Sequence, residues 1–250
     1  MAVRGGGTGL NLVMLGPPGV GKSLQSSRLA HHLRIPRIAT GELLRAEVAA
    51  GSELGQAVAA DLAAGRLVPD ELVLDLVRRR LQAEEAARGF VLDGFPRTLS
   101  QAQALDRLLA RLGRPLSHVL LLVAPDEVVV ERLRGRLRCP DCGATFQAGY
   151  FPARPGGTCP VCRGALRPTE DGGLRCQPCL RPLEPRPDDR PQVVRARLAR
   201  YHEEIGPVIE YYRARGLLRP VDATGSGDEV FESLLRAVGE PARSRPPSHR

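Results

Sequence analysis

The stretch Gly-Pro-Pro-Gly-Val-Gly-Lys-Ser, residues 16–23, decides the fold of this chain. It follows the short apolar run Asn11–Leu15 and precedes residues 24–34, where apolar side chains recur with helical character. The pattern Gly-x4-Gly-Lys-Ser between a strand and a helix is typical of a loop whose backbone N–H groups point at phosphate oxygens. The start of the helix adds positive potential at the same place. The sequence therefore predicts a phosphate-binding loop, or P-loop, after a buried strand.

Lys22, inside this loop, is the only lysine among the 36 Lys and Arg residues of the chain. A phosphate cradle needs a slim, flexible point charge, and the wide planar guanidinium of arginine is a poor substitute. We therefore expect the Lys22 ammonium to cap the β- and γ-phosphates of a nucleoside triphosphate.

Asp93 ends a second apolar run, Phe90–Leu92. Ligands of parallel sheets bind outside the carboxyl ends of the strands, so this carboxylate is expected beside the P-loop. Its chemistry suits Mg²⁺ held through water.

Composition limits the alternatives. The 250 residues carry a formal net charge of +8, which is compatible with nucleic acid, acidic lipid or phosphorylated small molecules as partners. The chain contains no apolar run of about eighteen residues, so no membrane span is expected. The short apolar start leads into the P-loop rather than a cleavage site, which favours a cytoplasmic protein. Residues 240–250, rich in Pro, Ser and Arg, are expected to be disordered.

Short apolar runs alternate with helical stretches along most of the chain. Besides the two runs already named, residues 118–123 and 216–221 are candidate strands. This alternation predicts an α/β fold with a parallel sheet covered by helices on both faces. Two segments break the rhythm and are expected to be insertions: residues 39–68 are helical without a buried strand, and residues 139–189 are rich in Pro, Gly, Arg and Cys.

All six cysteines lie in the second insertion as three CxxC pairs: Cys139/Cys142, Cys159/Cys162 and Cys176/Cys179. In a cytoplasmic protein this pattern indicates metal thiolates rather than disulfides. Four thiolates from two pairs would form a closed tetrahedral Zn²⁺ site, which can hold together a small loop-rich insert.

The chain resembles the adenylate kinases, the nucleoside monophosphate (NMP) kinases of the type with a long zinc-binding lid. The stretches that carry the resemblance cover nearly the whole chain in the family's order: GPPGVGKS, IATGELLRAEV (38–48), GRLVPDELV (65–73), GFVLDGFPRT (89–98), ERLRGRLRCPDCGATF (131–146) and PDDRPQVVRARL (187–198).

The resemblance implies a P-loop NTPase core with a parallel five-stranded sheet flanked by helices. The core would comprise residues 1–38, 69–134 and 190–250. A helical NMP-binding insert would span residues 39–68, and a zinc-ribbon-like lid residues 135–189.

The resemblance also implies the Mg²⁺-dependent reaction ATP + AMP ⇌ 2 ADP, carried out by a monomer whose partners are these nucleotides. Such a transfer needs positioning and charge neutralisation, and it requires no general base. The residues that match the family's ATP contacts are Gly19, Val20, Gly21, Lys22, Ser23, Leu24, Arg132, Arg136, Thr145, Phe146 and Gly225. Those that match its AMP contacts are Thr40, Arg45, Arg66, Leu67, Val68, Gly94, Arg97, Gln101, Arg186 and Arg197. Mg²⁺ would lie near Ser23 and Asp93, and the expected catalytic residues are Lys22, Arg97, Arg132, Arg136, Arg186 and Arg197.

The zinc ligands stay open at this stage. The family spacing C-x2-C-x16-C-x2-C matches Cys139, Cys142, Cys159 and Cys162, which we favour as the ligands. The pair Cys176/Cys179 stands at the family's distance from Arg186, so it is the alternative second half of the site.

Two other departures from the family concern the nucleotide site. Leu24 stands where the family usually has a threonine, and Ser23 is expected to replace its hydroxyl. Glu42 stands where the family usually has aspartate.

Two alternative functions remain. The first is a kinase acting on UMP, CMP or GMP. Thr40 and Gln101 argue against it, because they fit the recognition of adenine. The second is a zinc-ribbon nucleic-acid binder on a kinase-like scaffold, suggested by the net charge, the third CxxC pair and the basic tail. The lid has few aromatic side chains for base stacking (Phe146, Tyr150 and Phe151), so we expect no nucleic-acid partner.

Overall fold

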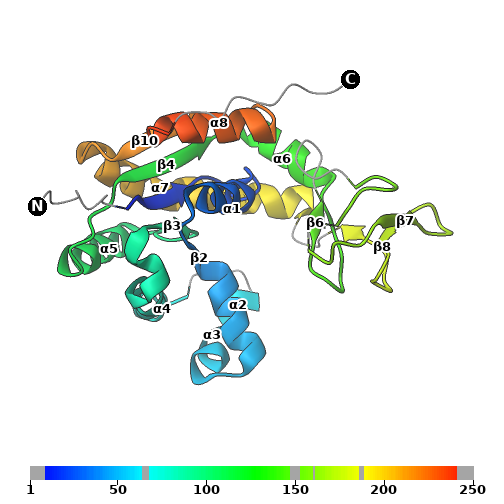
Figure 1. The fold of residues 1–250 in the computed structure, drawn as a ribbon, viewed down its shortest axis with the longest axis horizontal. Helices are drawn as coiled ribbons and strands as arrows, with labels where there is room; N and C mark the ends of the chain where they lie inside the picture. The colour runs from blue at the N-terminus through cyan, green and yellow to red at the C-terminus, as the bar shows by residue number, and fades with distance from the viewer. Residues whose placement is uncertain (1–8, 64–67, 147–152, 160, 186–188, 241–250) are drawn as a thin grey trace, which may run out of the picture.

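The computed structural model of the chain describes residues 9–63, 68–146, 153–159, 161–185 and 189–240. A five-stranded sheet forms its centre (Figure 1). The strands are β1 (Asn11–Leu15), β2 (Arg37–Ala39), β3 (Phe90–Asp93), β4 (His118–Val123) and β10 (Leu218–Asp222). They pair in the order β10-β4-β1-β3-β2, and every pair is parallel. The predicted parallel five-stranded sheet is confirmed.

The sheet separates two hydrophobic cores because successive strand side chains point to opposite faces. In β1, Leu12 and Met14 face one core, while Val13 and Leu15 face the other. The first core receives side chains from α1 (Lys22–Leu33), α6 (Asp126–Arg134) and α8 (Gly227–Ala237). The second receives them from α4 (Asp70–Gln82) and α5 (Leu99–Arg111). The long helix α7 (Pro191–Ala214) contributes to the first core near its start and to the second near its end.

Strand β2 is the element of the central sheet for which the apolar pattern provided no candidate. It is three residues long, and its first residue is Arg37, so it has no apolar run. Its place at the edge of the sheet is fixed by pairing with β3, in which Ile38 lies opposite Leu92 and Ala39 opposite Asp93.

The first insertion is a pair of helices, α2 (Thr40–Ala50) and α3 (Glu53–Ala63). They follow β2 directly and project below the sheet in Figure 1. Leu44 and Val58 from these helices join the second core. A short 3-10 helix, η1 (Glu84–Arg88), links α4 to β3.

The second insertion is a small β structure that projects to the right in Figure 1. Strands β5 (Leu137–Arg138), β6 (Thr145–Phe146) and β9 (Glu184–Pro185) pair in the order β6-β5-β9, while β7 (Leu166–Pro168) and β8 (Leu174–Cys176) form a hairpin. Four of the eight buried residues in its core are cysteines, so a zinc-ribbon-like lid is the matching description.

Among the described helices, none is long and apolar enough to cross a membrane. The tail expected to be disordered falls, apart from Glu240, outside the described residues.

Candidate active site

The P-loop connects β1 to α1 and has a backbone that glycine alone adopts easily. Gly19 and Gly21 have φ angles of 87° and 99°, in the left-handed region. A Cβ added to Gly19 would lie 2.5 Å from the Leu133 Cδ1 atom. The glycines therefore permit both the turn and close packing of the loop against α6.

Lys22, the first residue of α1, bends back over this loop. Its Nζ donates hydrogen bonds to the carbonyl oxygens of Gly16 at 2.8 Å and Pro17 at 3.2 Å. Burial, opposed by Asp93 and reinforced by Arg97 and Arg197, lowers the pKa of Lys22 to about 8. A polyanion in this place would stabilise the protonated amine, so the site is set up to receive negative charge.

A cavity of about 370 Å³ opens beside the loop, at the carboxyl edge of the sheet. Its walls come from the P-loop, β2 and α2, the end of β3, the base of the lid and α7. Its cationic lining residues are Lys22, Arg37, Arg45, Arg97, Arg136, Arg197 and Arg200. The carboxylates that line it are Glu42, Asp93 and Glu204. The excess of cations suits a ligand that carries several phosphates.

Asp93 is almost fully buried and lies at the centre of a small polar network. Its Oδ2 accepts hydrogen bonds from Arg37 Nη2 at 2.6 Å and from Ser26 Oγ at 3.1 Å. Burial would raise the pKa of this carboxyl, but Lys22 and Arg37 outweigh it and hold the pKa below its usual value. Asp93 is therefore ionised at neutral pH and available to a hydrated cation.

Arg37 is a lining residue that sequence reasoning missed. Besides Asp93, it pairs with Glu42, whose Oε1 lies 2.9 Å from Arg37 Nη1. The only available signal was its place directly before the Ile-Ala-Thr-Gly-Glu motif. A single charged residue at that place carries no pattern that predicts a position in the cavity, and its role became visible only once β2 was known to lie beside β3.

The expected AMP residues gather near the end of β3. Arg97 Nε donates to the Gly94 carbonyl at 2.9 Å, and burial lowers the pKa of Arg97. A Cβ on Gly94 would lie 3.1 Å from Thr40 Oγ1, and Thr40 itself is buried. Arg45 lines the same cavity.

Gln101 lies next to this group rather than in the lining. Its Oε1 accepts from the Arg97 backbone N–H at 2.8 Å, and its Nε2 donates to Asp70 Oδ1 at 2.6 Å. Val68 is buried in the second core. The expectations for Arg66, Leu67 and Arg186 fall outside the described residues.

The two arginines at the base of the lid differ in position. Arg136 lines the cavity and forms an ion pair with the buried Asp189, with its Nε 2.6 Å from Oδ2. Arg132 is not among the lining residues, and its guanidinium donates to the carbonyl oxygens of Ala223, Thr224 and Gly225 at 2.5, 2.8 and 2.9 Å. Arg132 thereby holds the loop that contains Gly225.

Two expected contacts of the lid lie away from the cavity. Thr145 and Phe146 form β6, and the Phe146 ring packs in the lid core with 2% of the residue exposed. Its side chain is therefore turned from the cavity in this conformation.

One face of α7 supplies several lining residues, of which only Arg197 was expected. Arg200, Tyr201, Glu204 and Ile205 follow it at helical spacing and line the same cavity. Positions three, four, seven and eight residues apart share a helix face, so this spacing was the available signal.

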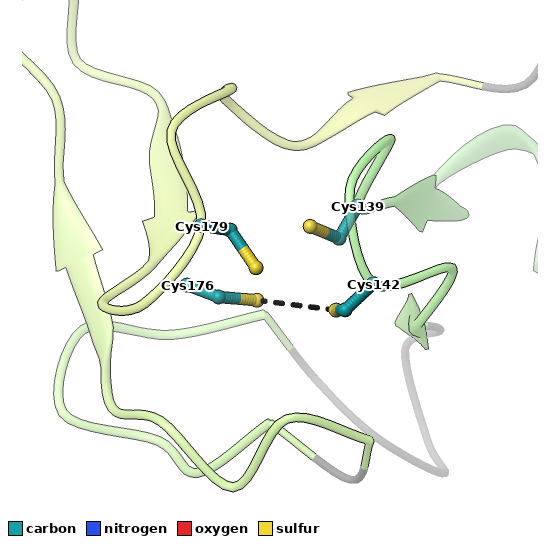
Figure 2. A group of neighbouring side chains, drawn as sticks. All are labelled: Cys139, Cys142, Cys176 and Cys179. Atoms are coloured by element: carbon teal, nitrogen blue, oxygen red, sulfur yellow. Dashed lines mark hydrogen bonds between the residues drawn. The ribbon is translucent and has the colours of Figure 1, made fainter.

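The cysteines converge inside the lid, but not as the spacing favoured. Two groups of four thiols have all their Sγ atoms within 4.8 Å of one another. One is Cys139, Cys142, Cys176 and Cys179 (Figure 2), and the other is Cys142, Cys159, Cys162 and Cys176. The favoured quartet, with Cys139, Cys142, Cys159 and Cys162, is neither of them.

The reason is contact between the first and third CxxC turns. Asp141 Oδ2 accepts from the backbone N–H groups of Leu180 and Arg181 at 2.8 and 2.9 Å. Arg181 Nε also donates to Asp141 Oδ1 at 2.6 Å. These contacts place Cys176 and Cys179 beside the first pair, which linear spacing could not reveal.

Comparison with known proteins agrees with this architecture. The family model described as adenylate kinase matches residues 14–217. The adenylate kinase of Agathobacter rectalis is 41% identical over 231 residues, 92% of this chain and 100% of the relative. That of Acidothermus cellulolyticus is 41% identical over 229 residues, 92% of this chain and 98% of the relative. That of Thermodesulfovibrio yellowstonii is 40% identical over 225 residues, 90% of this chain and 97% of the relative. Because the match runs through the core and both inserts, and these relatives are covered almost end to end, the chain belongs to the adenylate kinase family.

Proposed function

We propose that this phosphotransferase moves the γ-phosphoryl group of MgATP to AMP inside the arginine-lined cavity. Membership of the family makes the chain an adenylate kinase, and neither alternative function is favoured by the comparisons. One observation carries the assignment of the site. Lys22, Arg97, Arg136 and Arg197, from four separate parts of the sequence, line one cavity together with Asp93.

The transfer asks little covalent chemistry of the protein. An oxygen of the acceptor phosphate attacks the γ-phosphorus while the bond to the β-phosphate oxygen breaks, and no proton has to be removed. We assign Lys22 to the donor phosphates, Arg97 to the acceptor phosphate, and Arg136 and Arg197 to the charge that spreads over the transferred group. Planar guanidinium groups bind phosphate oxygens in pairs, which fixes the reacting atoms in line.

Ser23 and Asp93 are the residues that would hold Mg²⁺. Both line the cavity, and the lowered pKa of Asp93 supplies the ionised oxygen ligand that this cation prefers. Mg²⁺ adds neutralisation of phosphate charge when it is bound with ATP. Arg37 donates a hydrogen bond to Asp93 Oδ2 and thereby orients the carboxylate.

We assign the two inserts the role of covers over the cavity. Phosphoryl transfer to AMP requires that water be kept from the γ-phosphate, because water would otherwise hydrolyse ATP. The helices α2 and α3 follow β2 at the cavity wall, and Arg136 joins the lid base to Asp189 just before α7. Both inserts are therefore attached at the edge where the nucleotides would bind.

The lid is proposed to contain structural Zn²⁺. Its cysteines are buried or half-buried and unpaired by disulfides, and quartets of their sulfurs lie close enough for one tetrahedral ion. Such an ion would supplement the small hydrophobic core of this insert.

The proposed reaction is tested by ADP formation from MgATP with AMP, GMP, CMP and UMP in turn. Fast turnover with AMP alone is the expected result. Preference for another acceptor would contradict the assignment of Thr40 and Gln101 to adenine recognition. Absence of turnover with all four, in folded zinc-replete protein, would overturn the assignment of the cavity.

The pKa of Lys22 predicts a pH dependence that separates binding from chemistry. Since kcat/KM reports groups of the free enzyme, kcat/KM for MgATP should fall roughly tenfold per pH unit above about pH 8. Bound phosphates restore the protonated amine, so kcat should stay nearly constant over the same interval. Steady-state kinetics from about pH 6.5 to about pH 9.5 measure both. A flat kcat/KM over this range would contradict the proposed contact between Lys22 and ATP.

We further propose that the enzyme works as a monomer in the cytoplasm. Six cysteines without disulfides support a reducing compartment. Light scattering on the eluting protein, with and without nucleotides, measures its oligomeric state.

A further inference from the structure

The lid contains one pair of cysteines more than a single tetrahedral ion needs. The first group of thiols, Cys139, Cys142, Cys176 and Cys179, is one complete ligand set, and the second group is another. The groups overlap in two residues, because Cys142 and Cys176 belong to both. Two tetrahedral ions whose coordination tetrahedra share one edge require six sulfur ligands: two that bridge both ions and four that each bind one ion.

The distances between the sulfurs fit such tetrahedra. With Zn–S bonds of about 2.3 Å, the sulfurs of a tetrahedral site lie about 3.8 Å apart. Cys142 Sγ lies 3.7 Å from Cys159 Sγ, a contact within the second group. Cys142 Sγ lies 4.0 Å from Cys176 Sγ, the edge common to both groups, which Figure 2 marks with a dashed line. A disulfide would bring two sulfurs to about 2.05 Å, so these are not bonded pairs.

The three CxxC turns are also packed against one another by contacts that involve no metal. Asp141 joins the first turn to Arg181 after the third turn. The second turn meets the third at Gly164, where an added Cβ would lie 2.1 Å from Pro178 Cδ. Glycine at position 164 therefore allows the second pair of cysteines to approach the third, which is the approach the second group needs.

Burial places the sulfurs at the centre of the lid. Cys139, Cys159 and Cys176, one cysteine from each turn, are 0% exposed. With a single ion in the first group, the buried Cys159 thiol and its neighbour Cys162 would lie beside the site as unused ligands. With two ions, all six cysteines are ligands, and six thiolates with two Zn²⁺ have the same net charge as four thiolates with one.

We infer that the lid binds two Zn²⁺ ions in one cluster, in which Cys142 and Cys176 bridge both metals. Cys139 and Cys179 complete the coordination of one ion, and Cys159 and Cys162 that of the other. The two ions are bound together as the six thiols release six protons, so no oxidant or reductant is required. This inference concerns metal content and does not depend on the nucleotide specificity proposed above.

Zinc content of the full-length protein provides the first test. Purified without chelator, the chain should contain two zinc ions by elemental analysis, against a protein concentration from amino-acid analysis. The double variant Cys159→Ser/Cys162→Ser should retain one ion. Val161→Ser is the matched control, because Val161 lies between the same two cysteines, is 56% exposed and has no ligand atom. This variant should retain two zinc ions per chain. One zinc ion per wild-type chain would overturn the inference.

Cobalt substitution in the unmodified chain tests the shared sulfurs without any variant. As Co²⁺ is added, the thiolate charge-transfer absorption should rise until two ions are bound. The paramagnetic resonance signal should grow with the first ion and then decline, since thiolate bridges couple the two spins. A signal that doubles with the second ion would show independent sites and overturn the bridging assignment. Both measurements succeed or fail without reference to kinase activity.

Discussion

Replacing Lys22 by methionine is expected to lower kcat/KM for MgATP by about 10³-fold, or roughly 4 kcal/mol of transition-state stabilisation. The ammonium lies over the P-loop, bonded to the Gly16 and Pro17 carbonyls, where the proposed mechanism places the charge that develops on the phosphates. Lys22→Arg should recover less than a tenth of the lost activity, because a planar guanidinium does not fit the same cradle. Steady-state kinetics with saturating AMP measure both variants.

Thermal unfolding separates this loss from misfolding. The folded-state pKa of Lys22, about 8, lies below its ordinary value of 10.5, so the charged amine destabilises the folded protein below about pH 8. This penalty is relieved as pH rises from about 8 towards 10.5. Lys22→Met should therefore keep or raise the Tm at pH 7 while activity collapses. Full activity of Lys22→Arg would refute the explanation offered for the single lysine of this chain.

Replacing Arg97 by alanine is expected to lower kcat/KM for AMP by about 10²- to 10³-fold. Arg97 lies at the cavity wall with its Nε on the Gly94 carbonyl, and burial among other cations lowers its pKa. An acceptor phosphate would pair with this guanidinium, so its removal costs both AMP binding and alignment. Arg97→Lys should recover charge but not paired hydrogen bonding, and should regain only part of the activity.

Arg79→Ala is the matched control for Arg97. Arg79 is exposed on α4, and the ion pair that the structure gives it is with Asp75. A solvent-exposed pair of this kind contributes little to stability. Its replacement should leave both kinetic constants within about twofold. Calorimetric titration with ATP should show unchanged affinity in Arg97→Ala. An equal loss of ATP and AMP affinity would instead assign Arg97 to the fold of the cavity.

Removing the proposed metal with a chelator should first lower the stability of the lid, and affect phosphoryl transfer only as a consequence. Half of the buried residues in the lid core are cysteines, so the proposed metal coordination would supplement a small amount of apolar burial. Chelation should make residues of the lid accessible to trypsin while the sheet remains folded, which mass spectrometry of the fragments can show. Equal resistance with and without chelator would contradict a structural role for the metal.

The sequence by itself determined the elements whose causes are local. The P-loop could be predicted because its glycines, its lysine and the flanking strand and helix lie within a few tens of residues. The strands β1, β3 and β4 could be found because largely apolar runs are needed between two layers of helices, whereas the edge strand β10 is apolar only in part. The two inserts were visible as breaks in that alternation, and the resemblance to the adenylate kinases implied the roles that are proposed for them.

Only the tertiary structure decided features that depend on contacts between distant segments. Arg37 joins Asp93 because β2 pairs with β3, and three residues with a leading arginine carry no periodicity that could announce this. Likewise, the face of α7 that lines the cavity is defined by the elements across from it, the P-loop and the end of β3. The grouping of the cysteines is the clearest case. Linear spacing favoured Cys159 and Cys162 as partners of the first pair, whereas the contact of Asp141 with Arg181 brings the third pair there. The thiols of three similar turns are chemically equivalent in a sequence, and only their positions in space decide which of them lie close enough to hold one ion.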